Sequence, residues 1–520
     1  MRYCVVRRLI LVATTVAGAM VFASAAGGVT ITGEALAREL ASPRAIFLDR
    51  AVVKGPLNLQ QIGVVRAAFE CRSCTFAGGI RARHVVFERE IDLGGAHVHG
   101  PLDFDSASFR GAIVLGSGVL ATRVQGRVDF RLATFADVMD AEHVSFRRKA
   151  DFGLARFRGE AIFTGATFRG TAHFAGASFD QRVRFDGGSF TRDANFTRAI
   201  FGSTVDFRSR VFNRGQFANV DFRGLADFGQ ATFKGVAEFD ETRFEEDATF
   251  RGATFKANAN PDDDRALSLG YVVSQEKLDF GSATFKKFVF AENVVARALS
   301  FDDVTFVDPA QITLARLRVG DLEYPLGDVS RVADDAQQRD VLRQIESSAK
   351  NRGDIALAND ARYQLQTLAA RGYSGAEQVL DTVFYRWIAG YFVRPLQPLA
   401  VLVGLVLALS LVRWFSRTGG AAWKGLRGAW AWIVRVAPRR ARDAASNLRR
   451  AWLWLVGLAS KLFDTFALAV PRLRGGDDQA QARGMGRRLE ILAYRLLIVC
   501  ALLGLANSNP TLRQMFDALT

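Results

Sequence analysis

The sequence lacks the short motifs that mark several large enzyme classes. It contains no G-x-S-x-G nucleophile turn, no P-loop and no dinucleotide-binding fingerprint. Carboxylates are outnumbered, because 53 Asp and Glu stand against 68 Lys and Arg and leave a net charge of +15. We therefore assign no reaction to the chain, and we predict no catalytic residue, no metal and no cofactor.

Cysteine and histidine are scarce, with 4 and 5 residues in the chain. Cys71 and Cys74, in the run Cys-Arg-Ser-Cys, are predicted to form a local disulfide, with two free thiols as the alternative. No βαβ pattern surrounds them, which argues against a thioredoxin-like redox site. Zinc sites need four ligands at tight spacing, and His97 and His99 belong to a diffuse set that we interpret as solvated.

Phenylalanine is abundant, with 42 residues, and it recurs at alternating spacings of five and six positions. A step of five residues turns roughly 140° around a helix, so a helix would scatter these side chains. In an extended chain positions i−2 and i face the same way. A small residue stands at i−2 of nearly every Phe, as Ala161 does before Phe163. We predict a β-solenoid with an internal ladder formed by Phe152, Phe157, Phe163, Phe168, Phe174, Phe179, Phe185, Phe190, Phe196, Phe201, Phe207 and Phe212.

Several positions depart from this pattern. Val86 and Val295 take ladder places in stretches where the repeat is more aliphatic. Residues 258–277 interrupt the ladder and are predicted to loop out of one corner. Arg210 stands where a small residue is expected, two positions before Phe212, and predicts a local bulge.

Carboxylates recur beside the ladder, among them Asp151, Asp206 and Asp227. An acid–base pair would be unique and would lie in a cleft, whereas repetition indicates a solvated face. Because parallel β-helices do host polysaccharide-cleaving enzymes, a carbohydrate-active β-helix stays the enzymatic alternative.

The repeat resembles that of the pentapeptide-repeat family in units such as Ala161-Ile162-Phe163-Thr164-Gly165-Ala166-Thr167-Phe168-Arg169-Gly170. The resemblance covers residues 100–322 and implies an all-β, right-handed quadrilateral β-helix, in which each five-residue piece forms one side of a square. Cytoplasmic relatives that mimic DNA and act on gyrase need an acidic surface, which a chain of net charge +15 lacks. The excess of positive charge is concentrated in residues 413–450, where anionic lipid headgroups would account for it, so we expect no nucleic-acid partner.

The chain before and after the repeats divides into smaller parts. Residues 1–25 have the basic start, apolar run and Ala-Ser-Ala end of a secretory signal peptide. Residues 26–56 contain a predicted capping helix, with Thr32 as its N-cap, and a lead-in to the solenoid. The solenoid is predicted over 57–325, and two apolar stripes of helical period predict an α-helical hairpin connector over 334–372.

Residues 380–520 have the composition of an α-helical membrane module. Transmembrane helices are predicted at about 395–414 and 490–508, with an interfacial helix at 451–470. The segment between them is rich in arginine, which predicts a cytoplasmic location against anionic lipid headgroups. This lipid-facing basic segment includes Arg435, Arg439, Arg440, Arg442, Arg449 and Arg450.

The signal peptide and the charge bias predict the same topology, with the solenoid in the periplasm of a bacterium and the anchor in its inner membrane. We predict a non-catalytic binding or scaffolding surface for an envelope protein or polymer, in a chain that could also form an oligomer. The run from Tyr385 to Pro395 is similar to that of membrane-anchored pentapeptide-repeat proteins, some of which carry channel-like domains. Arg495, a charge within a predicted membrane helix, supports the alternative of a channel or transporter accessory or subunit.

Overall fold

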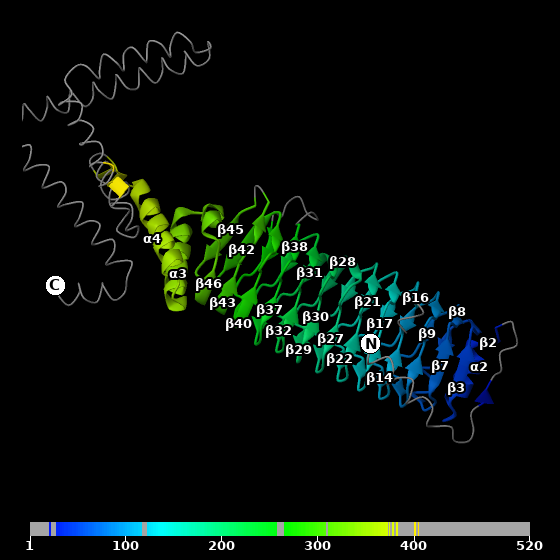
Figure 1. Ribbon diagram of the computed structural model, residues 1–520. Coiled ribbons are helices and arrows are strands. Elements are labelled where there is room, and N and C mark those ends of the chain that lie inside the picture. The colour runs from blue at the N-terminus through cyan, green and yellow to red at the C-terminus, as the bar shows by residue number, and fades with distance from the viewer. Residues whose placement is uncertain are drawn as a thin grey trace, which may run out of the picture. The chain divides into compact units, whose positions relative to one another are not determined.

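The computed structural model describes residues 20–21, 28–116, 122–256, 265–307 and 310–372, with isolated positions between 374 and 404. The chain divides into two units, residues 1–361 and 362–520, which we describe separately. The first unit is a long solenoid of short strands, with helix α2 at its beginning and helix α3 at its end (Figure 1).

The solenoid strands pair in parallel, in two hydrogen-bonded sets of 23 strands. Phe146 is in register with Phe168, and Phe157 with Phe179. One coil therefore contains two consecutive repeats, each made of a five-residue and a six-residue piece. Each coil has four straight pieces, which define four faces that we number I to IV in chain order. The β-solenoid predicted from the phenylalanine spacing is thereby confirmed.

The strands of each face are as follows. Face I contains β2 (Thr30–Thr32), β4 (Val52–Lys54), β8 (Thr75–Phe76), β12 (His97–Val98), β16 (Arg123–Val124), β20 (Ser145–Phe146), β24 (Thr167–Phe168), β34 (Thr232–Phe233), β38 (Thr254–Phe255), β41 (Thr284–Phe285) and β44 (Thr305–Phe306). Face II contains β5 (Leu57–Asn58), β9 (Ile80–Arg81), β13 (Leu102–Asp103), β17 (Val128–Asp129), β21 (Ala150–Asp151), β25 (Ala172–His173), β35 (Ala237–Glu238), β39 (Arg265–Ser268), β42 (Phe288–Glu292) and β45 (Ile312–Ala315). Two longer strands, β28 (Ser189–Asn195) and β31 (Val211–Gln216), run through both faces.

The other two faces are built in the same way. Face III contains β6 (Val64–Val65), β10 (Val86–Phe87), β14 (Ser108–Phe109), β18 (Thr134–Phe135), β22 (Arg156–Phe157), β26 (Ser178–Phe179), β29 (Ile200–Phe201), β32 (Asp221–Phe222) and β36 (Arg243–Phe244). Face IV contains β1 (Met20–Val21), β3 (Ile46–Asp49), β7 (Phe69–Arg72), β11 (Ile91–Asp92), β15 (Ile113–Val114), β19 (Met139–Asp140), β23 (Ala161–Ile162), β27 (Val183–Arg184), β30 (Val205–Asp206), β33 (Ala226–Asp227) and β37 (Ala248–Thr249). Three strands run through both faces, β40 (Val273–Asp279), β43 (Val295–Ser300) and β46 (Arg318–Glu323).

The core is the inside of the square. All twelve phenylalanines of the predicted ladder are buried, and so are the alanines two positions before them. Rings on successive coils stack, for example Phe152 on Phe174 with centroids 4.8 Å apart and Phe163 on Phe185 at the same distance. Stacked aromatic pairs add to the gain from burying the rings themselves, so the ladder is the main source of stability.

The structure corrects the predicted limits of the ladder. Strands β2, β3 and β4 already pair with later coils, so the solenoid begins before residue 57. Residues 265–277 do not loop out, because β39 and β40 continue the faces and bury Leu267, Leu269 and Val272. Aliphatic side chains replace phenylalanine there, and this substitution hid the repeat.

The aliphatic stretches also shifted the predicted phase. Val86 and Val295 point away from the core, whereas Val85, Phe87 and Val294 are buried. A β-strand alternates its two faces, so a run of adjacent apolar residues does not say which of them faces inward.

Helices close the two ends of the first unit. Helix α2 (Gly33–Leu40) begins at Thr32, whose side chain accepts a 3.2 Å hydrogen bond from the Ala35 N–H, and it buries Leu36 and Leu40. The predicted helical hairpin is present as α3 (Asp335–Arg352), preceded by the 3₁₀ helix η1 (Leu326–Arg331), and α4 (Ile355–Ala369), followed by η2 (Ala370–Gly372).

Helix α3 covers the last coil. Its Ser348 hydroxyl accepts a 2.8 Å hydrogen bond from the Leu322 N–H, and its Gln337 accepts one of 3.0 Å from the Leu314 N–H. Gln344 donates to the Leu317 carbonyl at 3.3 Å. These side chains form hydrogen bonds with backbone groups of the last coil, which would otherwise be unpaired at an open sheet edge.

No helix among the described residues is both long and apolar enough to cross a membrane. The predicted membrane module, with its basic segment and Arg495, lies outside the described residues apart from isolated positions. The same holds for the predicted signal peptide, except that Met20 and Val21 pair with β3 as strand β1.

Candidate interaction surface of the solenoid

In the described coils the ladder rings and alanines fill the interior, and the cavity at its beginning, lined by Leu40 and Leu57, measures only about 10 Å³. Function therefore has to come from outward positions. At two opposite corners of each coil, II to III and IV to I, the chain turns through a residue with positive φ, such as Leu154 (φ 59°) and His143 (φ 57°). The other two corners, I to II and III to IV, carry most of the charge variation between coils.

The recurring carboxylates are part of the turns and do not form the solvated face that the sequence predicts. Asp151 is 8% exposed and Asp206 is 4% exposed. Oδ1 of Asp151 accepts from the Gly153 N–H at 3.1 Å, and Oδ1 of Asp206 accepts from the Arg208 N–H at 3.0 Å. The same bond recurs on other coils, because a carboxylate or amide here satisfies a backbone donor two residues later.

Ion pairs along these turns set the electrostatics of individual coils. Arg208 donates to Asp206 at 2.6 Å and lies 3.5 Å from Asp227 one coil later. Burial raises the pKa of Asp206, but the hydrogen bonds from Arg208 outweigh it, and the net shift is downward. For Asp227, burial dominates and raises the pKa of the carboxyl.

Arg210 is the largest exception in the core. Its side chain is fully buried in a column that holds alanine at Ala166 and Ala231. Nη1 donates to the carbonyls of Phe185 at 3.0 Å and Gly187 at 2.7 Å, while Nε and Nη2 have no hydrogen-bond partner.

The charge of Arg210 has aromatic rings and carbonyls as its direct contacts. The guanidinium carbon lies 4.3 Å from the Phe190 ring centroid, a cation–π contact. Burial lowers the pKa of Arg210 to about 9, against the weaker opposing effect of Asp186. At neutral pH the protein therefore keeps a positive charge inside its hydrophobic core.

The chain around Arg210 is adapted to its size. Gly188 occupies the same column one coil earlier, with φ 61°, and a Cβ there would lie 2.9 Å from Nη1 of Arg210. Pairing of β28 with β31 shifts register between Phe190 and Asp193. Val211 and Phe212, which follow Arg210, still pair in register with Ser189 and Phe190. The irregularity therefore lies after Phe212, on the corner between faces I and II, and not at Arg210 as the sequence predicts.

A shallow depression of about 500 Å³ lies on the II to III corner. Leu132 and Leu154, 55% and 62% exposed, form its apolar floor on successive coils, and Arg131 and Arg198 line it as well. Arg131 is paired with Asp129 at 3.0 Å. The lining includes no carboxylate, histidine or cysteine, so the depression has groups for contact and none for acid–base or nucleophilic chemistry.

Comparison with protein-family models gives one match, to the model described as pentapeptide repeats (9 copies), over residues 141–189, 163–209 and 217–260. Residues 141–209 and 217–260 carry pentapeptide repeats. Comparison with curated proteins and comparison with solved structures returned no match. The matched residues lie in the coils where the phenylalanine ladder is most regular.

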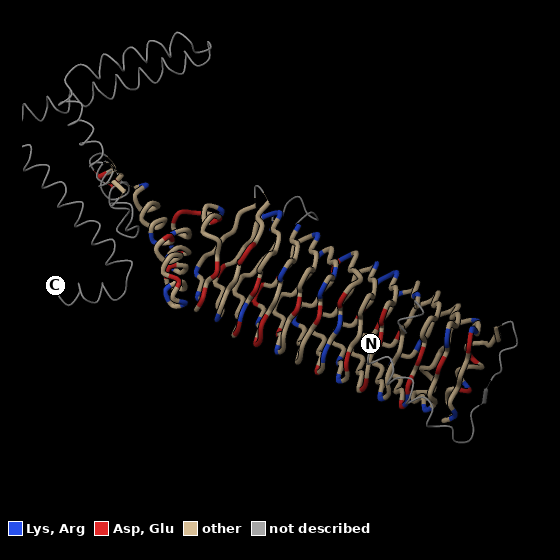
Figure 2. Tube along the Cα trace, viewed as in Figure 1, with Lys and Arg blue, Asp and Glu red and all other residues tan. Residues whose placement is uncertain are grey.

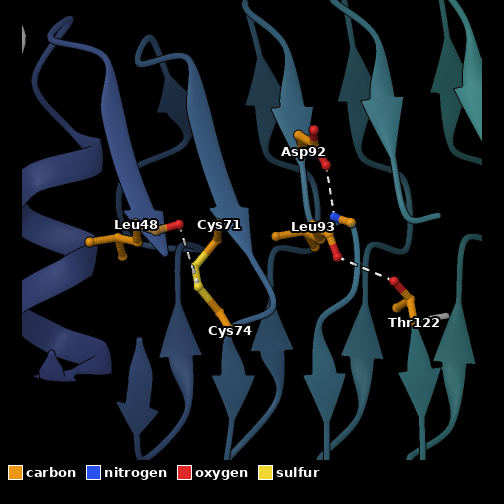
Figure 3. Close-up of a disulfide and its surroundings, with 7 residues drawn as sticks. Leu48, Cys71, Cys74, Asp92, Leu93 and Thr122 are labelled. Atoms are coloured by element: carbon orange, nitrogen blue, oxygen red, sulfur yellow. Dashed lines mark hydrogen bonds between the residues drawn. A yellow bond between two sulfur atoms is a disulfide. The ribbon is translucent and has the colours of Figure 1, made fainter. Parts of the chain in front are cut away.

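Cys71 and Cys74 lie inside the solenoid, in a coil that precedes the matched residues. Cys71 and Cys74 are bonded, with Cα atoms 5.6 Å apart, and both are fully buried (Figure 3). Cys71 stands beside Leu48 of the preceding coil, and Sγ of Cys74 lies 3.9 Å from the Leu48 carbonyl oxygen. The disulfide spans one inner corner and is shielded from solvent.

The histidines of the solenoid do not form a cluster. His84, His97, His99 and His143 are exposed, and burial lowers the pKa of the half-buried His173, with a further effect of Lys149. Within the described part of the chain, no group of three or more His, Cys, Asp or Glu side chains is arranged to hold a metal ion.

Sequence reasoning missed the turn-forming role of the carboxylates and the exposed leucines. Both leave a signal once the coils are aligned by their phenylalanines, because Asp then recurs one position before the inward Phe. Leu132 and Leu154 each stand two positions after an inward Phe, at the corner where the chain turns with positive φ. Exposed leucine with positive φ is unusual, since the left-handed region suits glycine and asparagine.

Proposed function

We propose that the protein is a membrane-anchored, non-catalytic binding surface that holds an envelope protein or polymer along its pentapeptide-repeat solenoid outside the cytoplasm. The observation that supports this proposal is the difference between the inward and the outward positions of each coil. Inward positions are filled by the Phe and Ala columns, and outward positions vary from coil to coil on a rigid frame. Solenoids offer such long surfaces to extended partners.

The anchor and the topology rest on the sequence of residues 1–25 and 380–520. The buried Cys71–Cys74 disulfide is compatible with an oxidising compartment. Reporter fusions test the topology, one placed after Asp334 and one between residues 424 and 450. A reporter that needs export should be active at the first site only, and activity at the second site would contradict the proposal.

Binding is tested in living cells with a photo-crosslinking amino acid placed at one outward position at a time. Arg169, between faces I and II, and Arg158, between faces III and IV, are suitable because both are exposed. A defined covalent adduct at one or both positions is the expected result. Reproducible ion conductance of the purified protein in planar bilayers, abolished by Arg495→Leu, would replace the binding function with the channel alternative.

A further inference from the structure

The corner between faces I and II carries a row of unneutralised positive charges. We name it the basic edge, and it consists of Arg147, Arg148, Arg169, Arg192, Lys234, Lys256 and Lys286. Figure 2 shows Lys and Arg at the ends of many coils along this side, where Figure 1 labels β16, β28, β31 and β38.

Backbone hydrogen bonds hold these residues in line. The N–H of Arg169 donates to the Phe146 carbonyl at 2.8 Å, and that of Lys256 donates to the Phe233 carbonyl at 2.8 Å. Each such bond fixes one residue of the basic edge against the backbone of the preceding coil, so the residues line up along the solenoid. Neighbouring strands lie about 4.8 Å apart, so the charges repeat at about that spacing wherever successive coils both carry one.

The basic edge differs from its neighbours because its charges have no partner. Other basic residues at the same corner are paired: Lys149 lies 2.9 Å from Asp151, and Arg127 lies 3.4 Å from Asp129. The seven residues of the basic edge form no ion pair and no side-chain hydrogen bond within the described structure. Asp193, the carboxylate next to Arg192, forms none either. Like charges on adjacent strands repel, so the row costs stability unless a partner supplies counter-charges.

The opposite corner, between faces III and IV, shows that this charge is not imposed by the fold. There Glu88 pairs with Arg110 at 3.5 Å and Arg243 with Glu245 at 3.5 Å. Glu246 and Asp247 add further negative charge. Two corners with the same backbone thus differ in charge, because among the described residues of the I to II corner Asp193 is the single carboxylate.

A row of hydroxyl groups runs beside the basic edge on face I. Its members open the strands of that face and are half-buried, with side chains that have no hydrogen-bond partner among the described residues: Ser145, Thr167, Ser189, Thr232, Thr254 and Thr284. Exposed aromatic side chains, which single-stranded nucleic acid needs for stacking, lie elsewhere in the described structure, at Phe47 and Tyr271. Among the described residues along the basic edge, Val307 at its end is the only exposed large apolar side chain.

We propose that the basic edge binds a linear anionic polysaccharide lying along the solenoid axis. This inference rests on the proposed binding function and names the class of its partner. The cations pair with the regularly spaced acidic groups of the polymer, and the hydroxyl row accepts and donates hydrogen bonds to its sugar hydroxyls. A lipid surface would favour a broad patch with apolar side chains to insert, and a single row of cations suits a single chain.

The test uses the full-length protein in a non-ionic detergent, with polygalacturonate as the anionic polysaccharide and its methyl ester as the uncharged control. One variant combines Arg147→Gln, Arg169→Gln, Lys234→Gln and Lys256→Gln. The matched control combines Arg89→Gln, Arg156→Gln, Arg158→Gln and Arg182→Gln, four exposed residues. It removes the same charge and leaves the basic edge intact. Circular dichroism checks that both variants fold.

The basic-edge variant should bind polygalacturonate roughly tenfold or more weakly than the native protein, because exposed charge pairs are individually weak but add over four positions. The control variant should lose less than about twofold, and added salt should weaken binding of the native protein most. Equal losses in both variants, or equal binding of the methyl ester, would overturn the inference.

Two further probes decide the class of partner. Vesicles containing phosphatidylglycerol and a thymidine oligonucleotide are tested with the same variants. If the basic-edge variant loses more affinity for the vesicles or for the oligonucleotide than for polygalacturonate, the partner is a membrane or a nucleic acid and the inference is wrong. Crosslinked adducts at Arg158 in cells, combined with no binding of polygalacturonate, would overturn the inference and leave the proposed binding function standing.

Discussion

The regular coils and the coil around Arg210 solve the same packing problem in different ways. In the regular coils a column of small residues, such as Ala166 and Ala231, leaves just enough room for the ladder rings. At Gly188 and Arg210 the same column holds the smallest and one of the largest side chains on successive coils. The glycine supplies the space that the arginine fills.

This difference shows that the interior of a coil accepts a larger side chain only where the neighbouring coil has a smaller one in the same column. Packed interiors resist added volume, and here the missing side chain of Gly188 leaves the space beside Nη1 of Arg210. The regular coils have close-packed apolar interiors, whereas the Arg210 coil keeps a charge without a carboxylate partner. Removing a ladder ring from a regular coil and removing the buried charge of Arg210 should therefore change stability in opposite directions.

The largest effect should come from emptying a regular coil. Phe174→Ala removes a fully buried ring that stacks on Phe152 and Phe196 at 4.8 and 4.9 Å. We expect a loss of about 3–5 kcal/mol in the free energy of unfolding. Denaturant unfolding of the full chain, followed by circular dichroism, measures it. Phe47→Ala is the control, since Phe47 is 41% exposed and should lose far less.

Adding one methyl group beside Arg210 should be the next most damaging change. In Gly188→Ala the new Cβ would lie 2.2 Å from the Ala166 carbonyl oxygen, at a φ of 61°. Clash and strain together should cost roughly 2–4 kcal/mol. Gly55→Ala is the matched control, because Gly55 also has positive φ but its Cβ would meet nothing within 4 Å. Equal losses in the two variants would show that backbone strain alone matters and that space does not.

Removing the buried charge should stabilise the irregular coil. Arg210→Met keeps much of the side-chain volume and removes the unpaired guanidinium, so we expect a gain of about 2 kcal/mol in the free energy of unfolding. The carbonyl of Phe185 then loses the donor that Arg210 supplies, which limits the gain. A loss comparable to that of Phe174→Ala would mean that the carbonyl and ring contacts outweigh the cost of burying the charge.

The comparison also shows what the sequence could predict. The Phe spacing predicted the solenoid and its core, because inward positions repeat with little variation, and Arg210 stood out as a break in that pattern. Residues 265–277 were misassigned because leucine and valine replaced phenylalanine in the same geometry. The carboxylates were misassigned because the pattern of Asp151 and Asp206 is the same for a solvated face and for a turn. The basic edge becomes visible only when the coils are stacked, since its members lie a whole coil apart in the sequence.

The smallest expected effect concerns two turn carboxylates on successive coils, Asp206 and Asp227. Asn can keep the turn bond, as Asn195 shows by accepting from the Thr197 N–H at 2.9 Å, so Asp→Asn isolates the charge. The pKa of Asp206 is lowered on balance, because the hydrogen bonds from Arg208 outweigh the effect of burial. Its ionised form therefore stabilises the fold above the pKa of the unfolded chain, near 4.

Asp206→Asn should lower the free energy of unfolding by about 1 kcal/mol at pH 7, and this difference should vanish as the pH falls through the lowered pKa. Asp227→Asn should act in the opposite direction, because burial raises the pKa of Asp227 and its ionised form weakens the fold. That variant should be at least as stable as the native protein at pH 7 and equal to it at low pH. Unfolding curves at several pH values measure both differences. The same loss in both variants at pH 7 would show that Arg208 does not distinguish the two coils, although it lies 2.6 Å from one carboxylate and 3.5 Å from the other.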